Sequence, residues 1–505
     1  MGLEGFFSGI DSLSRIFIAA YAMVGLPCMI YMLSLHKDAR LAATAIAFIA
    51  AALGVVTAPD FLWFLIFWEV TVLLACRLIV HERKPESIAV AYRYFVIQVI
   101  AGTSLFFAIA IQYAATGSFA MGAVVPEAVP FFLVAFVIKA AMIPLHIWVL
   151  LTYPCVSPAV AVILSAYCTK IGVYAFARIL PGVPWIAYAG ACMALFGVAM
   201  ALRQKTARRL LSYHLISQVG YMIAAIGVGT ELGISGGTLH MLNHVMYKSL
   251  LFMVAGAVLY RTGTEVLTRV GGVGKAMPLT FLAGLAGAAA ISGVPPFNGY
   301  VSKTLLKAAT DGDVFLKWAL LLAGVGTAFS FAKFTWYLFL RKQSDAPAQA
   351  EIREIREMPL GPCVAMAMLA LLCIGQGVFY LNGYAVTSNP TVFAVYGLDQ
   401  VLWGAAPPFM GVTLFVVVRG VVWGTTPADR TGKPDASRSR RNRSRKSTSL
   451  RDEYRLWDLD VIYSWALERI LVASQTAAQK ARDETQVYIL VITAAMLALV
   501  AFLWW

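Results

Sequence analysis

Apolar residues recur along the chain in long runs that are separated by short polar or charged loops. Runs of roughly 18 residues or more are long enough to cross about 30 Å of hydrocarbon as α-helices. We expect about fourteen such spans, at 12–35, 41–58, 60–80, 90–115, 129–151, 156–180, 182–202, 208–230, 234–260, 276–308, 314–340, 359–383, 401–423 and 484–505. The pattern predicts an all-α, polytopic membrane protein.

The charge of the loops alternates along the chain, which supports the predicted spans independently of the apolar pattern. Cations gather after the first, third, seventh, ninth, eleventh and thirteenth spans, as Lys37, Arg40, Arg83, Lys84, Arg203, Lys205, Arg208, Arg209, Arg261, Arg269, Lys275, Arg341, Lys342, Arg353, Arg356 and the run 430–451. The intervening loops carry few cations, and only the loop around Lys307 and Lys317 is mixed. The positive-inside rule then places both termini on the outer side, which is the periplasm in a Gram-negative bacterium.

The pattern changes near the C-terminus. Residues 1–424 are expected to form the transmembrane domain, and 425–453 form a Ser/Arg/Pro-rich stretch that cannot bury enough apolar surface to fold alone. We interpret this stretch as a basic, flexible cytoplasmic linker. Within 454–483, apolar residues follow helical spacing with charges between them, which predicts a short amphipathic helix lying laterally on the membrane. The run 484–505 is expected to be a C-terminal transmembrane anchor.

Composition agrees with a membrane protein. Of 505 residues, 60% are hydrophobic and 13% charged, with a mean hydropathy of +0.76, whereas soluble proteins carry about 25% charged residues. The net charge of +14 lies mostly in the loops and in the 430–451 run, so it signals topology and not nucleic-acid binding. The seven cysteines lack paired ligand spacing. We therefore expect no disulfide and no protein-bound metal. We also expect no cofactor and no catalytic centre in this chain.

Eight ionisable residues within the predicted spans are candidates for a function. They are Glu69, Lys139, Lys170, His240, His244, Lys248, Lys303 and Lys333. A charge at the centre of a span costs about 2.5–3.5 kcal/mol on insertion scales, so each needs a partner, water or a function. A single lysine can snorkel to the interface, and Lys333, near the cytoplasmic edge of its span, is the strongest case for this alternative. Snorkelling and structural ion pairs account poorly for the other seven together.

The residue types in this set suit proton transfer. Burial lowers the pKa of a lysine and a nearby carboxylate raises it, so moving one charge makes a lysine take up or release a proton. Histidine titrates near pH 6.5, so small changes in the local field switch its charge. His240, His244 and Lys248 are spaced i, i+4 and i+8 on one helix face. The alternative for the two histidines is hydrogen bonding to backbone or Ser/Thr groups within the bundle.

Prolines interrupt two of the apolar spans. Pro144 follows Lys139 by five residues, and Pro295, Pro296 and Gly299 come shortly before Lys303. Proline removes backbone hydrogen bonds that lipid cannot replace, so interrupted backbone at membrane depth lines a cavity or is buried in protein. We expect broken-helix hinges at these positions; a simple packing kink is the alternative.

Seven ordered stretches over about 290 residues carry a family resemblance. They are Ile10-Asp-Ser-Leu-Ser14, Phe64-Leu-Ile-Phe-Trp-Glu69, Val137-Ile-Lys-Ala-Ala-Met-Ile-Pro-Leu-His-Ile-Trp148, Lys170-Ile-Gly-Val-Tyr174, Arg209-Leu-Leu-Ser-Tyr213 with Ile216-Ser-Gln-Val-Gly-Tyr221, Leu239-His-Met-Leu-Asn-His244 through Lys248-Ser-Leu-Leu-Phe252, and Gly293-Val-Pro-Pro-Phe-Asn-Gly299 with Ser302-Lys303. The chain resembles the antiporter-like subunits of respiratory complex I, membrane-bound hydrogenases and Mrp cation/proton antiporters.

The resemblance implies inverted repeats, each with a broken helix, that relate the Lys139 and Lys303 regions. It implies that Glu69 pairs with Lys139 and that Lys170 is the central connecting lysine. His240, His244 and Lys248 would form the second half-channel, which ends at Lys303. The implied function is proton or Na⁺ translocation in a prokaryotic inner membrane, coupled to redox chemistry or cation exchange and driven by other membrane subunits.

Some features depart from the family. After Trp148 the family continues with Pro-Asp-Ala-His, whereas this chain reads Val149-Leu-Leu-Thr-Tyr153. The chain also begins where the third helix of the family begins, so another protein chain or lipid would cover the place of two helices. The complex could be an NADH:quinone oxidoreductase-like enzyme, a hydrogenase or an Mrp antiporter. Two alternatives remain: an energy-coupling subunit for inorganic carbon uptake and a non-conducting scaffold.

Overall fold

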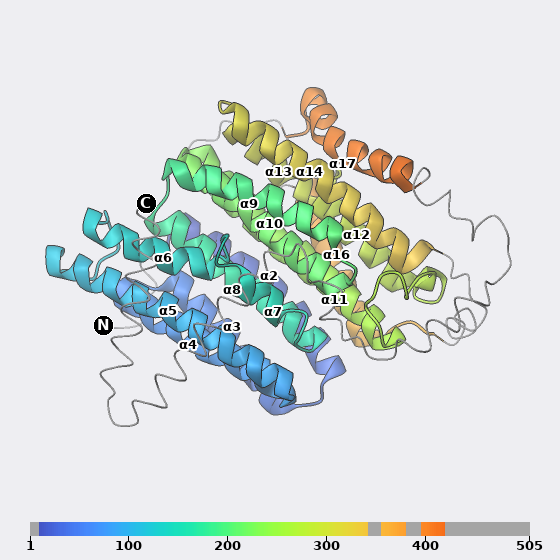
Figure 1. The fold of residues 1–505 in the computed structure, drawn as a ribbon, viewed down its shortest axis with the longest axis horizontal. Coiled ribbons are helices and arrows are strands. Elements are labelled where there is room, and N and C mark those ends of the chain that lie inside the picture. Colours follow the sequence, from blue (N-terminus) through green and yellow to red (C-terminus); the bar gives the residue numbers. More distant parts are fainter. Residues whose placement is uncertain (1–9, 342–354, 380–394, 420–505) are drawn as a thin grey trace, which may run out of the picture. The chain divides into compact units, whose positions relative to one another are not determined.

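The computed structural model describes residues 10–341, 355–379 and 395–419. These residues form helices, and no β-strand is present among them (Figure 1). The chain divides into two compact units, Met1–Thr413 and Leu414–Trp505. All the helices that carry the predicted site belong to the first unit. The predicted linker 425–453, lateral helix 454–483 and anchor 484–505 lie outside the described residues.

Most predicted spans correspond to one helix each. The helices are α2 (Ser12–Leu35), α3 (Ala39–Thr57), α4 (Phe61–Ile79), α5 (Pro85–Thr116), α6 (Val129–Lys139), α7 (Ile147–Thr152), α8 (Pro158–Ile179), α9 (Pro184–Arg203), α10 (Ala207–Val228), α11 (Glu231–Thr262), α12 (Pro278–Ser292), α13 (Asn298–Thr310), α14 (Val314–Thr335), α16 (Leu360–Phe379) and α17 (Leu398–Val418), with the short turns η1 (Val80–Glu82), η2 (Pro126–Ala128) and η3 (Val273–Lys275) and the π-helical turn η4 (Trp336–Leu340).

Eleven helical segments of the described residues are long and apolar enough to cross a membrane. The predicted polytopic all-α fold is therefore confirmed. Two predicted spans, 129–151 and 276–308, are each divided into two shorter helices, α6 with α7 and α12 with α13. The predicted span 484–505 lies beyond the described part of the chain.

Aspartates in the loops begin several of these helices. The carboxylates of Asp11, Asp38, Asp60 and Asp313 accept hydrogen bonds of 2.8–2.9 Å from backbone N–H groups in the first turns of α2, α3, α4 and α14. Such caps satisfy N–H groups that have no partner within the helix. Their loops lie at helix ends, where a charged cap can reach water.

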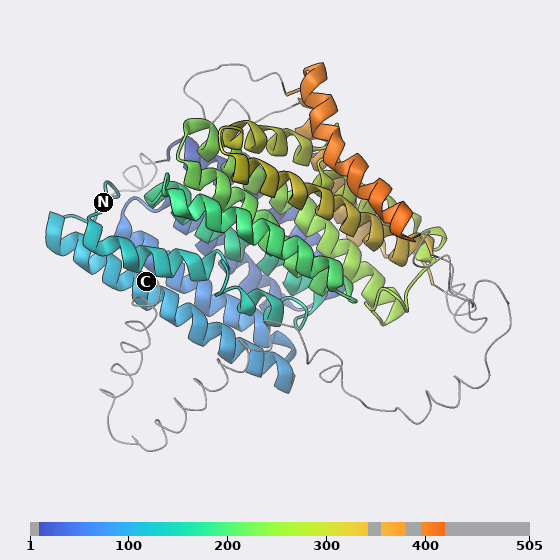
Figure 2. The ribbon, with the colours of Figure 1, turned by 45° about the horizontal axis from the view of Figure 1, so that its top comes forward.

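Three helices form the buried centre of the bundle. The most apolar windows of α8, α10 and α11 are 94–100% buried, whereas only 39% of the window in α4 is buried. Helix α8 packs on α2, α6, α10 and α11, and α11 also contacts α12, α13 and α16. Figures 1 and 2 show α3 to α5 to one side of α8 and the green and yellow helices α9 to α14 to the other. The helices that carry Lys170, His240, His244 and Lys248 are thus shielded from lipid.

Small residues bring the central helices close together. A Cβ at Gly190 of α9 would lie 2.4 Å from the backbone nitrogen of Ala224 in α10, and one at Gly220 of α10 would lie 2.6 Å from that of Ala194. Membrane helices gain van der Waals contact in this way because lipid supplies no hydrophobic drive between them.

Contacts between loops follow the alternation of loop charge. The loops after α2 and α4 meet where His81 Nε2 lies 3.7 Å from Asp38 Oδ2. The loops after α7, α9 and α11 meet where Arg208 donates to Val156 O and to Glu265 Oε2, both at 2.6 Å. At the other helix ends, Phe61 N donates to Phe119 O at 2.9 Å, which joins the loops after α3 and α5. Which face is cytoplasmic stays a prediction.

Candidate functional site

The first group of buried ionisable residues lies where α4, α5 and α6 meet. Lys139 is the last residue of α6, and its Nζ donates to Thr71 Oγ1 at 3.3 Å and lies 4.7 Å from the centre of the Trp68 ring. Glu69 precedes Thr71 by two residues on α4, and its Oε1 is buried without a hydrogen-bond partner among the described residues. The two charges act on each other without a direct ion pair. The expected Glu69–Lys139 pair is therefore open in this structure.

A glycine on α5 makes room for the carboxylate. A Cβ at Gly102 would lie 1.7 Å from Glu69 Oε1, closer than any real contact. No other residue type fits there unless Glu69 moves. Gly102 was not predicted from the sequence, because a glycine within an apolar span carries no chemical signal of its own.

The backbone between α6 and α7 is broken directly after Lys139. Ala141 adopts a left-handed conformation with φ +55°, and α7 resumes only at Ile147. The indole of Trp148 donates from Nε1 to Ile138 O at 2.9 Å and so ties α7 to the end of α6. Lys139 thus lies at a helix C-terminus, where the carbonyl dipoles favour a cation. Pro144 lies within this break.

Helix α8 approaches the first break closely and carries the central lysine. A Cβ at Gly172 would lie 2.4 Å from the backbone nitrogen of Ala140. Lys170 is fully buried, and its Nζ donates to Ser165 O at 2.5 Å and to Thr169 Oγ1 at 3.2 Å. Because α8 packs on both α6 and α11, Lys170 lies between the first and second groups of ionisable residues.

The second group runs along α11 and is buried throughout. His240 contacts Ser302 Oγ through Nδ1 at 2.9 Å and Gln218 Oε1 through Nε2 at 3.2 Å, so it joins α13 and α10. One turn later, neither ring nitrogen of His244 has a hydrogen-bond partner among the described residues, and its ring centre lies 5.4 Å from that of Tyr247. The serine and glutamine contacts of His240 fit either role, structural or relay. His244 has no such anchor.

Lys248 follows His244 by one turn. Its Nζ donates to Leu211 O in α10 and lies 5.5 Å from the Phe252 ring centre. The charge of Lys170 acts on both His244 and Lys248. The structure therefore brings the central lysine, Lys170, within electrostatic range of the α11 row, as we call the group formed by His240, His244 and Lys248.

The second break lies between α12 and α13 and contains Pro295 and Pro296. Helix α12 ends at Gly293 with φ +81°, and Lys303 reaches back across the break to donate from Nζ to Ile291 O at 2.6 Å. A Cβ at Gly299 would lie 1.8 Å from Ala290 O, so only glycine permits this approach. Both breaks thus place a buried lysine beside the carbonyl end of a half-helix.

Lys333 lies apart from these contacts. Its Nζ donates to Leu202 O at 2.7 Å and to Gln204 O at 3.0 Å, at the end of α9. A lysine on the last carbonyls of a helix is a common capping arrangement. Its hydrogen bonds are therefore those expected of a lysine that has only a structural role near the end of its span.

His214, which is fully buried in α10, was not among the residues predicted from the sequence. Its ring centre lies 4.7 Å from that of Phe331, and the charges of Lys248, Lys303 and Lys333 act on it. A signal was present, because His214 is an ionisable residue inside the predicted span 208–230. The neutral partners Gln218 and Ser302 carried no comparable signal.

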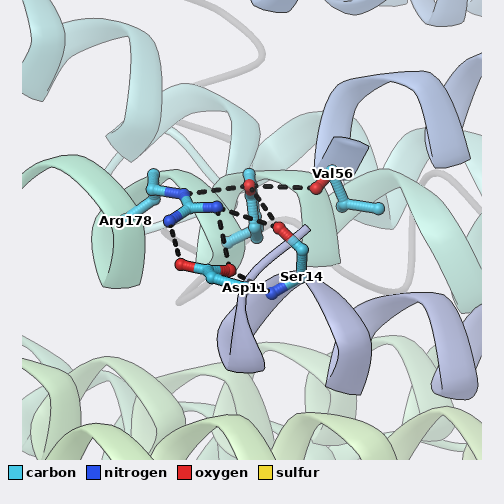
Figure 3. Close-up of polar contacts among 5 residues, drawn as sticks. Asp11, Ser14, Val56 and Arg178 are labelled. Carbon is cyan, nitrogen blue, oxygen red and sulfur yellow. Dashed lines mark hydrogen bonds and ion pairs between the residues drawn. The ribbon is translucent and has the colours of Figure 1, made fainter. Parts of the chain in front are cut away.

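A further polar cluster joins α2, α3 and α8 (Figure 3). Arg178, in the last turn of α8, donates to the Asp11 carboxylate, to Ser14 Oγ at 2.9 Å and, through Nε, to Tyr174 Oη at 3.0 Å. Tyr174 donates onward to Val56 O at 3.1 Å. Burial acts to raise the pKa of Asp11, but the hydrogen bonds and charge of Arg178 outweigh it and hold that pKa below its ordinary value of 3.8.

The described residues contain no group of three His, Cys, Asp or Glu that could hold a metal ion.

Residues 58–330 match the family described as NADH:quinone oxidoreductase/Mrp antiporter, TM. The match spans more than half of the chain and covers both helix breaks.

Curated relatives with similar sequences include two Na(+)/H(+) antiporter subunits of Alkalihalophilus pseudofirmus. One of them is 31% identical over 346 residues, which are 64% of this chain and 70% of the relative. The other is 27% identical over 431 residues, which are 74% of this chain and 53% of the relative. The chain thus spans about half the length of this second relative.

A solved structure has the same fold. A chain of the membrane-bound sulfane sulfur reductase, an archaeal respiratory membrane complex, superposes with a TM-score of 0.72 at 24% identity. The match covers 97% of this chain and 88% of that one. At this identity the similarity establishes the fold alone.

Proposed function

Because this chain belongs to the NADH:quinone oxidoreductase/Mrp antiporter transmembrane family, we propose that it moves protons or Na⁺ across a membrane as one subunit of a larger complex. The proposed path runs from Glu69 and Lys139 through Lys170 to the α11 row and Lys303. One observation supports it most: two helix breaks, each beside a buried lysine, are linked through α8 and α11.

The lysine partners suit a path whose charges change. Lys139, Lys170 and Lys303 donate to a hydroxyl or to backbone carbonyls and make no direct ion pair among the described residues. A neutral acceptor binds both an ammonium and an amine, so it does not fix either state. A purely structural lysine in low dielectric would need a paired counter-charge more urgently.

Glu69 supplies the movable charge in this mechanism. When its carboxylate approaches Lys139, the ion pair stabilises the charged lysine. When the two separate, the charge of Lys139 acts on Lys170 and changes its affinity for a proton. The open pair of this structure is one of these two states. The breaks at Pro144 and at Pro295, Pro296 and Gly299 serve as hinges because their backbone lacks continuous helical hydrogen bonds.

The second half of the path uses the α11 row. A proton released near Lys170 passes to His244, then to His240, and reaches Lys303 by way of Ser302. His244 lacks a fixed partner and His240 contacts α13, so the two rings are placed for acceptance and onward transfer. Partner membrane subunits supply the driving energy, and the basic loops face the cytoplasm.

The test uses the complex purified through this chain and reconstituted in lipid vesicles. A potassium diffusion potential drives ions inward, and a trapped pH dye and a sodium tracer report which ion moves. We expect Glu69→Gln to lower coupled flux about 100-fold, the order contributed by positioned proton-transfer groups. Unchanged flux of both ions in Glu69→Gln would favour the non-conducting scaffold.

A further inference from the structure

A small cavity lies beside Lys303, at the end of the proposed path. It has room for about one water molecule, about 20 Å³. Its lining comes from five segments: α10, the second break, α13, α14 and α17. Lys303 and Lys307, one turn apart on α13, both line it.

Lys307 completes a hydrogen bond that α17 cannot make for itself. In an uninterrupted helix the carbonyl of Trp403 would accept from the N–H of residue 407, but that residue is proline. The next residue, Pro408, also lacks an N–H. Lys307 Nζ donates to Trp403 O at 3.1 Å instead. The lysine thus donates to a carbonyl that lacks its usual helical donor because residue 407 is proline.

Lys307 lies nearer the end of α13 than Lys303 does, and it is less buried. Lys303 is 7% exposed, whereas Lys307 is half-buried and lies three residues before α13 ends at Thr310. In the following loop, Asp311 pairs with Lys317 of α14 at 2.6 Å. This loop belongs to the set predicted on the outer face. The cavity therefore connects the last buried lysine with a half-buried lysine near that face.

We propose that Lys307, the Trp403 carbonyl and this cavity form the proton exit of the path. The inference rests on the proposed function and adds its last step. A proton leaves the Lys303 ammonium, passes through one water molecule and binds the Lys307 amine, so one ammonium becomes an amine and the other amine becomes an ammonium. Lys307 then releases the proton to water, and its bond to the neutral Trp403 carbonyl can be made by either the ammonium or the amine.

The surroundings of Lys307 allow its charge to change. The titratable groups that line the cavity with it are Lys303 and Tyr300 of α13 and Tyr221 of α10. The segment of α17 contributes glycine and prolines, α14 contributes Leu320 and Gly324, and Asp399 of α17 acts on Tyr300. Among the described residues, the lining of the cavity contains no carboxylate that would fix Lys307 in the charged state.

The first test replaces Lys307 in the intact complex and measures proton flux under an imposed potential. We expect Lys307→Met to slow flux at least about tenfold. Lys307→His should restore part of the flux and make it depend on pH near 6.5, the ordinary pKa of histidine. A lysine that only supports the α17 backbone would leave the pH profile unchanged. Wild-type flux and pH profile in both variants would overturn the proposal.

The second test fills the cavity without touching a charge. A Cβ at Gly324 would lie 3.4 Å from Pro407 Cβ and 3.5 Å from Tyr221 Oη, which are ordinary contacts. Gly324→Ala should therefore fold normally and slow proton flux by displacing the water. The control is Gly375→Ala on α16, where a Cβ meets no atom within 4 Å. Equal flux in the two alanine variants would contradict a water-filled exit.

Lys139→Ala separates failure of the exit from failure of the whole path. If Lys139→Ala stops flux and the Lys307 and Gly324 variants conduct normally, the exit is wrong and the proposed function stands. If Lys139→Ala also conducts normally, the proposed function fails. Recovery of the assembled complex is measured for each variant by size-exclusion chromatography, so loss of folding is distinguished from loss of conduction.

Discussion

The Glu69 carboxylate occupies its place only because residue 102 is glycine. The carboxylate packs against α5, and its Oε1 has no hydrogen-bond partner among the described residues. An unpartnered buried carboxylate oxygen is costly, and such costs are common where a group must move. The position of Glu69 is therefore set by space and not by a fixed bond.

Gly102→Ala tests this steric control at the residue scale. The added Cβ would lie 1.7 Å from Glu69 Oε1, so the carboxylate must shift by more than about 1 Å. Misplacing a reacting group by about 1 Å can cost about 100-fold in rate. We expect a comparable loss of coupled flux with the charge of Glu69 retained. Gly122→Ala, whose Cβ meets nothing within 4 Å, is the control and should conduct normally.

Asp11 gives a pH-dependent prediction. Its pKa is lower in the folded protein than the ordinary 3.8, so its contribution to stability is present above that value and is lost as pH falls through the folded pKa. Because Asp11 is 46% exposed, solvent limits the effect to less than about 1 kcal/mol. Asp11→Asn should lower the melting temperature slightly at neutral pH and not below the folded pKa. Equal differences at both pH values would exclude an ionic contribution.

Charged residues of the site could be predicted from the sequence, whereas their neutral partners could not. Lys139 or His244 is conspicuous in an apolar run because burial of an ionisable group is expensive. Thr71, Ser302 and Gly102 are ordinary residues in membrane helices, and they gain a role only when another helix approaches. That approach depends on tertiary packing, which spacing along one chain does not encode.

At the scale of elements, the two breaks show the same limit. Prolines and glycines in the sequence mark the second break, from Gly293 to Gly299. At the first break the sequence offers only Pro144 as a signal, because the left-handed turn falls on Ala141 and not on a glycine. The close approach of Gly172 to Ala140 explains how that turn is held.

Pro407→Ala tests the role of the interrupted turn in α17. The new N–H can bond the Trp403 carbonyl, so it competes with Lys307 for one acceptor. Proline inside a helix costs about 3 kcal/mol, so the variant should raise the melting temperature while proton flux falls. Hydrogen exchange at residue 407 should be slow if the new helical bond forms. Slow exchange with normal flux would exclude a gating role for this turn.

At the scale of the whole molecule, much of the architecture was predictable because two signals agree. Apolar runs predicted long membrane-crossing helices, and loop charge independently supported that prediction. The structure divides two of these runs into half-helices. The ends of the half-helices could not be predicted, because hydrophobic periodicity does not reveal where a half-helix ends. The predicted segments 425–453, 454–483 and 484–505 remain expectations, as does the placement of both termini on the outer face.

The central claim is that ions cross the membrane through the buried row that begins at Glu69 and Lys139. The most direct measurement is proton and sodium flux in vesicles that contain the complete complex with Lys139→Ala, beside wild type and Lys139→Arg. We expect loss of coupled flux in Lys139→Ala with assembly intact, and partial retention in Lys139→Arg, which keeps the charge. Normal flux through a fully assembled Lys139→Ala complex would contradict it.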